Sequence, residues 1–188
     1  TLTQNNVPIY QDFNGTVKGN SKDRLKRTYR VKVYYNHVNG TQYLSLYSNT
    51  DKWIGYIDAK KVEQFAKPEG KKWGASGYAT ILKTGYPVTG TMGGKTKTTS
   101  DKLRYQTYQV VASHQHFNGQ TYYLLRDNNK QELGYVDARA VGKVAGAEGV
   151  KRSSGQYITF TKNYNFYKDF KWTKAGTSQA LKGKTYRL

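Results

Sequence analysis

Apolar and polar residues alternate with a period of two along much of the chain. From Tyr29 to Tyr35, apolar and aromatic residues alternate with Arg30 and Lys32, which is the pattern of a strand with one buried face. A second strand is expected around Leu44 and Leu46, and a third from Trp53 to Ile57. Because no segment keeps a 3.6-residue period, the sequence predicts an all-β fold of short strands, compatible with small barrels.

Turn signals separate these strands. Asn39-Gly40 and Asn118-Gly119 each lie between two strand-like segments, and we expect hairpins there because both central residues can adopt positive φ. Asp58 closes the third strand, and its side chain is predicted to cap the tight turn through Ala59 and Lys60.

The pattern recurs after 79 residues, so the chain contains an internal repeat. Residues 28–62 align without a gap with residues 107–141, and 14 of the 35 positions are identical. The clearest match is Gly-Tyr-Ile-Asp-Ala at 55–59 with Gly-Tyr-Val-Asp-Ala at 134–138. Thr-Tyr-Arg-Leu at 185–188 resembles Thr-Tyr-Arg-Val at 28–31, so a third copy is expected to begin and remain unfinished.

The repeats and the Gly-rich, charged segments between them predict five regions. These are a first repeat (1–66), a linker (67–77), a second repeat (78–141), a second linker (142–155) and an incomplete third repeat (156–188). The first residues are Thr-Leu-Thr without a Met, so we expect a fragment of a larger protein.

The composition of the chain restricts the classes of function that are possible. The 188 residues include 31 Lys plus Arg, 12 Asp plus Glu and no Cys, and the net charge of +19 is spread over all the repeats. The absence of Cys excludes disulfides, thiolate metal sites and a thiol nucleophile. A strongly basic, repetitive chain attracts polyanions, and salt weakens this attraction.

The densest basic cluster lies at the start of the first repeat, where one sheet face is expected to present a row of cations. We predict that the ligand-binding residues are basic side chains of the first two repeats, supported by one Tyr in each. The predicted residues are Arg24, Lys26, Arg27, Arg30, Lys32 and Tyr34, and Lys95, Lys97, Lys102, Arg104 and Tyr105.

Residue sets for catalysis are not evident in the sequence. His114 and His116 are spaced so that a strand would put them on one face, but no Cys or nearby carboxylate completes a metal site. Asp58 and Asp137 recur in turns, where capping explains them better than acid–base chemistry. We therefore predict no catalytic residue, no metal and no cofactor.

Two segments resemble a known family. Val-Asn-Gly-Thr-Gln-Tyr followed by Trp-Ile-Gly-Tyr-Ile-Asp-Ala-Lys-Lys-Val, and Phe-Asn-Gly-Gln-Thr-Tyr-Tyr followed by Leu-Gly-Tyr-Val-Asp-Ala-Arg-Ala-Val, are similar to the closing half of GW modules. These roughly 80-residue repeats occur in autolysins and internalin B-like surface proteins of Gram-positive bacteria. The resemblance implies tandem SH3-like barrels. It also implies attachment to the cell envelope through teichoic or lipoteichoic acid.

One feature departs from that family. The namesake Gly-Trp is Gly-Tyr here, at 55–56 and 134–135. Tyr keeps a large aromatic side chain in place, but the change weakens assignment to one subfamily, and the basic, Tyr-rich S-layer attachment repeats of lactobacilli stay open as a related possibility.

The hypothesis is a non-catalytic wall-binding module that holds a secreted protein on the outside of the bacterial surface. No membrane span is expected, and a hydrolase domain elsewhere in the parent protein is compatible with this role. An adhesin that binds host sulfated glycosaminoglycans is the alternative. A nucleic-acid binder is a weaker one, because no recognition helix or aromatic ribonucleoprotein motif accompanies the cations.

Overall fold

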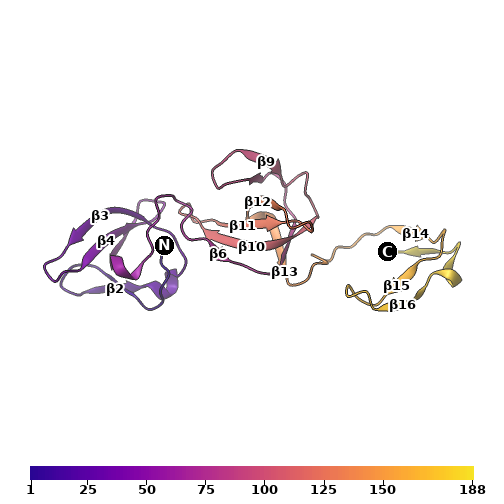
Figure 1. Ribbon diagram of the computed structural model, residues 1–188, viewed down its shortest axis with the longest axis horizontal. Helices are drawn as coiled ribbons and strands as arrows, with labels where there is room; N and C mark the ends of the chain where they lie inside the picture. Colours follow the sequence, from indigo (N-terminus) through magenta and orange to yellow (C-terminus); the bar gives the residue numbers. More distant parts are fainter.

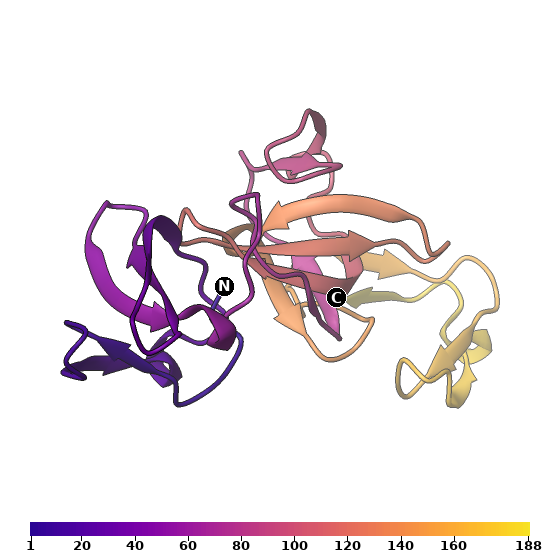
Figure 2. The ribbon, with the colours of Figure 1, turned by 60° about the vertical axis from the view of Figure 1, so that its left-hand side comes forward.

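The computed structural model describes residues 1–188 as three β units in a row. We call residues 1–72 unit one, 73–151 unit two and 156–188 unit three. Unit two lies between the other two in both views (Figures 1 and 2). The only helices are short 3₁₀ turns, and none has the length and hydrophobicity that a membrane crossing requires.

Unit one contains a five-stranded antiparallel sheet in the order β2-β1-β5-β4-β3. Its strands are β1 (Pro8–Tyr10), β2 (Val17–Asn20), β3 (Arg30–Asn36), β4 (Gln42–Tyr47) and β5 (Trp53–Asp58), with the 3₁₀ turns η1 (Ser21–Arg24) and η2 (Ala59–Lys61). Six buried side chains form its core: Leu2, Val7, Ile9, Leu44, Leu46 and Ile57.

Unit two repeats this arrangement and adds strands at one edge, giving the order β13-β7-β10-β11-β12-β8-β9 with β6 also paired to β10. Its elements are β6 (Trp73–Gly74), β7 (Tyr78–Ile81), β8 (Pro87–Thr89), β9 (Thr96–Thr99), β10 (Thr107–Gln115), β11 (Thr121–Arg126), β12 (Glu132–Asp137), η3 (Ala138–Ala140) and β13 (Val141–Val144). Eight buried residues form its core: Ala79, Ile81, Val88, Tyr108, Val110, Leu125, Val136 and Ala140.

Unit three consists of two separate strand pairs. Strand β14 (Tyr157–Thr159) pairs with β17 (Thr185–Arg187), and β15 (Asn165–Tyr167) pairs with β16 (Lys174–Thr177), which is followed by η4 (Gln179–Leu181). The β14–β17 pair corresponds to β7 and the start of β10 in unit two. Ser178 is the one buried residue of unit three, so this unit has no apolar core of its own.

A buried serine fixes the same turn in all three units. The hydroxyls of Ser21, Ser100 and Ser178 each accept a hydrogen bond from a backbone N–H 14 residues earlier, at 2.9, 3.0 and 2.8 Å. Each serine is 0% exposed. Because a buried N–H needs a partner, the serine determines how the opening strand pair joins the turn that follows it.

A second repeated contact joins the first strand of each unit to the long one. The hydroxyls of Thr80 and Thr107 lie 2.9 Å apart, and the equivalent Thr1–Thr28 and Thr159–Thr185 pairs are at 3.0 and 2.7 Å. These threonine pairs identify the start of unit three as equivalent to the opening of the other two.

The structure confirms the all-β fold and the three strands predicted within the repeat. Asp58 caps its turn as predicted, since its carboxylate accepts from Lys60 N at 2.8 Å. The predicted hairpins form. Only Gly40 (φ 79°) and Gly119 (φ 85°) are left-handed, because His37 N bonds Thr41 O and closes a three-residue loop.

Both segments expected to be linkers contain strand residues. Strand β6 lies within 67–77 and pairs with β10, and β13 runs into 142–155 and pairs with β7. Glycine residues in these segments do not prevent pairing, because the sheet of unit two offers open strand edges there. The limits of the repeats stay a prediction.

Candidate polyanion-binding surface

Most cations of this chain have no internal counter-charge. Salt bridges engage only four of the 31 Lys and Arg side chains. Every ligand-binding residue predicted from the sequence is exposed except Arg24, which is half-buried. The positive charge of all three units is therefore available to a ligand. The basic side chains form several separate groups, which are described in turn below.

The expected row of cations on one sheet face forms only in part. Arg30 and Lys32 share a face of β3, but both pair with Asp51, at 2.6 and 2.7 Å. The hydrogen bond from Lys32 is the main cause that lowers the pKa of Asp51, and Arg30 adds to it. Asp51 thus neutralises the strand portion of the predicted row, and the other three cations of this cluster lie off the sheet.

Lys26 and Tyr34 occupy separate places. Lys26 follows η1, where its ammonium lies 5.0 Å from the ring centre of Trp73, and Lys71 approaches the same ring at 5.0 Å. Tyr34 is 60% exposed on β3. The structure therefore does not bring Lys26 and Tyr34 into one site with Arg30 and Lys32.

A cation site that the sequence analysis missed lies beside β5. The Lys18 ammonium sits 3.7 Å from the centre of the Trp53 ring, a cation–π contact. Burial lowers the pKa of Lys18, and the nearby charges of Lys52 and Arg24 lower it further. Lys18 and Lys52 are far apart in the sequence, so only the pairing of β1 with both β2 and β5 reveals this group.

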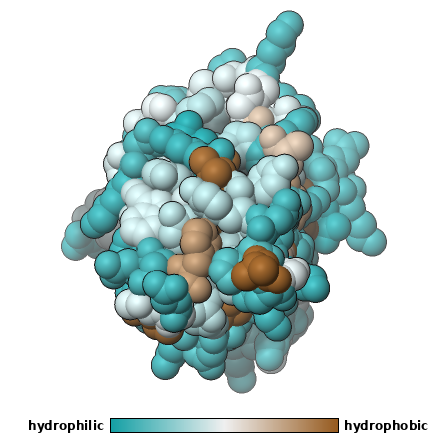
Figure 3. Space-filling view, turned by 90° about the vertical axis from the view of Figure 1, so that its left-hand side faces the viewer, coloured by the Kyte–Doolittle hydropathy of each residue, from teal (hydrophilic) through white to brown (hydrophobic).

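Aromatic rings surround this site in unit one. The ring centre of Phe13 lies 4.5 Å from that of Tyr56 and 5.0 Å from that of Tyr35. The ring centres of Trp53 and Tyr56 are 5.2 Å apart. Burial, reinforced by the Tyr35 phenol, raises the pKa of Tyr56. Figure 3 shows the end of unit one remote from unit two, where side chains of intermediate hydropathy gather and hydrophilic ones surround them. At the equivalent positions of unit two, Met92, His114 and Glu132 replace three of the rings.

The predicted cations of unit two form two smaller groups. Lys95 and Lys97 lie at and near the start of β9, while Lys102 and Arg104 lie in the loop before β10. The Arg104 guanidinium is 4.6 Å from the ring centre of Tyr105, and that of Arg152 is 3.1 Å away. Arg152, in the segment that follows unit two, was not predicted, because nothing in its local sequence indicates contact with Tyr105.

Arg24 and Arg27 line a pocket between units one and two. Its volume is about 290 Å³, and unit two contributes residues 115–117 and Gly119 to its wall. A hydrogen bond from Asn49 Nδ2 to Asn118 O, at 2.8 Å, joins the two units beside it. Two of the predicted cations therefore share one concave site.

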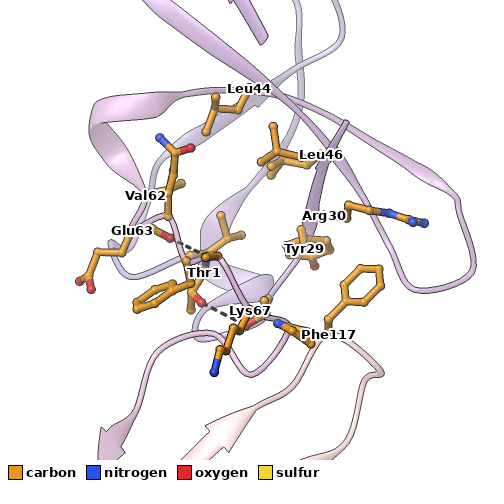
Figure 4. Close-up of a pocket in the computed structure, with 16 residues that line it drawn as sticks. Thr1, Tyr29, Arg30, Leu44, Leu46, Val62, Glu63, Lys67 and Phe117 are labelled. Atoms are coloured by element: carbon orange, nitrogen blue, oxygen red, sulfur yellow. Dashed lines mark hydrogen bonds between the residues drawn. The ribbon is translucent and has the colours of Figure 1, made fainter. Parts of the chain in front are cut away.

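A larger cavity of about 360 Å³ lies on the other side of Tyr29. Figure 4 shows Leu44, Leu46 and Val62 around it, with the Thr1 amino group donating to Glu63 O at 2.8 Å. The cavity borders the core of unit one, and only three charged side chains line it.

No family model and no curated protein matches this chain. Among solved structures, the chain is similar to a crystal structure of a candidate autolysin from Listeria monocytogenes. The sequences are 12% identical and the TM-score is 0.37, over 100% of this chain and 82% of that one. A likeness of this size leaves the function to be argued from the residues of the chain itself.

Proposed function

We propose that this chain is a non-catalytic cell-wall-binding module that anchors a secreted protein to the Gram-positive surface through teichoic or lipoteichoic acid. The observation that carries the proposal is the number of free cations, because all but four of the 31 Lys and Arg side chains lack a carboxylate partner. The resemblance of residues 38–62 and 117–141 to GW modules supports the choice of ligand.

The proposed mechanism is multivalent electrostatic attraction. A phosphate polymer carries a charge on every repeating unit, and the three basic units stand in a row along the molecule (Figure 1). Each unit makes weak contacts, but once one unit is bound the others bind intramolecularly. Linking sites in this way raises avidity by about 10²–10⁴. Salt screens such contacts, with a Debye length of about 8 Å at physiological ionic strength.

The test is sedimentation with purified Gram-positive walls, with and without chemical removal of teichoic acid, over a series of salt concentrations. We expect binding to intact walls to fall steeply with salt and to be lost on stripped walls. Equal binding to stripped walls would contradict the proposal.

Competition separates the alternatives. Soluble lipoteichoic acid should displace the protein from walls at lower concentration than heparin does, when both are compared at equal charge. The reverse order would favour a host glycosaminoglycan as the ligand, and displacement by DNA alone would favour a nucleic acid.

A further inference from the structure

The pocket between units one and two is lined by hydrogen-bond donors. Arg24 and Arg27 enter it from unit one, and a guanidinium can only donate. His116 enters it from unit two. Its Nδ1 accepts from Asn118 N at 3.0 Å, so the hydrogen of the neutral ring lies on Nε2, which is left as a donor.

Tyr29 adds an unpaired hydroxyl to the same wall. Its oxygen is buried and has no hydrogen-bond partner, whereas the equivalent Tyr108 donates to Gln106 Oε1 at 2.5 Å in unit two. Position 27 of unit one corresponds to Gln106 and holds Arg, which has no acceptor atom. The substitution that removes the acceptor of Tyr29 therefore also brings a positive charge to the pocket.

We propose that this pocket binds one phosphate group of the polymer, which rests on the proposed function and deepens it by naming a site. Phosphate supplies only acceptor oxygens and negative charge, and a guanidinium binds it with two parallel hydrogen bonds. Arg24, Arg27 and His116 Nε2–H hold the anion, and one of its oxygens accepts from Tyr29. The volume of about 290 Å³ accommodates a phosphate with an attached polyol.

The site joins the two units. Two of its cations belong to unit one and its imidazole to unit two, on either side of the Asn49–Asn118 hydrogen bond. A bound phosphate therefore favours the arrangement in which the units are in contact, and binding along a polymer is coupled to their relative orientation.

The experiment is an NMR titration of the 188-residue chain with glycerol 3-phosphate and, separately, with inorganic phosphate. We expect saturable shifts of the His116 ring and the Asn118 amide signals with both probes. A response to only glycerol 3-phosphate would show that the polyol is also recognised, and a response to both confirms a phosphate site.

Two variants make the test specific. Arg27→Gln restores the residue of unit two, so the fold is kept and Tyr29 gains an acceptor, while phosphate affinity falls by about tenfold or more. Lys22→Gln removes the same charge from an exposed position in η1, the 3₁₀ turn that contains Arg24, and should leave the affinity within about twofold. Equal losses in both variants, or no saturable shift at His116, would overturn the site. Wall sedimentation reports independently on the proposed function.

Discussion

Strands β3 and β10 are equivalent in the two repeats, yet their surroundings differ. In β10 every second residue is buried, and Val110 and Ala112 are 1% and 2% exposed. The equivalent Val31 and Val33 of β3 are 39% and 46% exposed. The reason lies in the pairing, because β10 has β11 on one edge and β6 and β7 on the other, while β3 pairs only with β4.

This difference shows that alternation of apolar and polar residues predicts a strand but not the burial of its side chains. A bulge between Val31 and Val33 pairs them with the consecutive residues Leu46 and Ser45, so their side chains lie on opposite faces of the sheet. Neither side chain is buried, so the predicted single buried face of this strand is wrong for unit one. Burial depends on strands from elsewhere in the chain. The two units therefore share a strand order, and they differ in the aromatic rings that gather beside β5, where unit two has Met92, His114 and Glu132.

The largest effect is expected where the units do not differ. Gly55 (φ +145°) and Gly134 (φ +141°) let β5 and β12 pass close to the backbone of β1 and β8. A Cβ at Gly55 would lie 2.5 Å from Ile9 Cγ2 and 2.7 Å from Tyr10 O. Gly55→Ala and Gly134→Ala should each lower the free energy of unfolding of the unit concerned by about 3 kcal/mol or more.

Urea unfolding followed by circular dichroism measures this loss. Gly19→Ala is the matched control, because no atom lies within 4 Å of its Cβ, and it should change stability by less than about 0.5 kcal/mol. A change of that size for Gly55→Ala would show that β1 and β5 separate freely.

Removing the hydroxyl of the buried serine should destabilise unit one more than unit two. Ser21 accepts from Val7 N and also donates to Gln4 O at 2.8 Å, whereas Ser100 has one side-chain bond, from Tyr86 N. Because each substitution leaves a buried N–H unpaired, Ser21→Ala and Ser100→Ala should each cost about 1–3 kcal/mol. Thermal unfolding should show the larger loss for Ser21→Ala, and equal losses would mean that the bond to Gln4 contributes nothing.

Replacing Asp51 by the residue of unit two tests how much the ion pairs of Arg30 and Lys32 limit ligand binding. Asp51 pairs with Arg30 and Lys32, and its equivalent in unit two is Lys130, which also has a positive φ. Asp51→Lys should release both cations and raise affinity for lipoteichoic acid about twofold or more at low salt.

Surface plasmon resonance on immobilised lipoteichoic acid measures this change. Stability should shift by less than about 1 kcal/mol, because the ion pairs are exposed. Asp127→Lys adds the same charge in unit two without freeing a paired cation, and an equal gain there would mean that only net charge matters.

The smallest effect is a pH dependence confined to unit two. Burial lowers the pKa of His114, so the unfolded chain binds its proton at a pH where the folded unit does not. The stability that this neutral ring contributes is present above about pH 6.5 and is lost as the pH falls through the lower folded pKa. Unit one has Tyr35 at this position and should lack the effect.

Urea unfolding at about pH 7.5 and about pH 5.5 measures this, with Trp73 as the reporter for unit two and Trp53 for unit one. His114→Gln should reduce the difference between the two pH values in unit two. An equal pH dependence of both units would assign it to other groups.

The candidate site could be predicted only in part. Arg24 and Arg27 were expected to bind ligand, and the structure places both in the pocket between the units. His116 and Tyr29 were not expected there, because their distance along the chain gives no sign of contact. The contact between Lys18 and Trp53 was not expected for the same reason, since the two residues are 35 positions apart and come close only through the pairing of β1 with β2 and β5.

By itself, the sequence determined the all-β class, the 79-residue repeat, the hairpins and the excess of positive charge, because these follow from local alternation, turn residues and composition. Tertiary structure decided which strand faces are covered, which cations Asp51 neutralises and which donors meet between the units. Those outcomes depend on contacts between residues far apart in the chain, and a side chain's burial and charge partners are set by what packs against it.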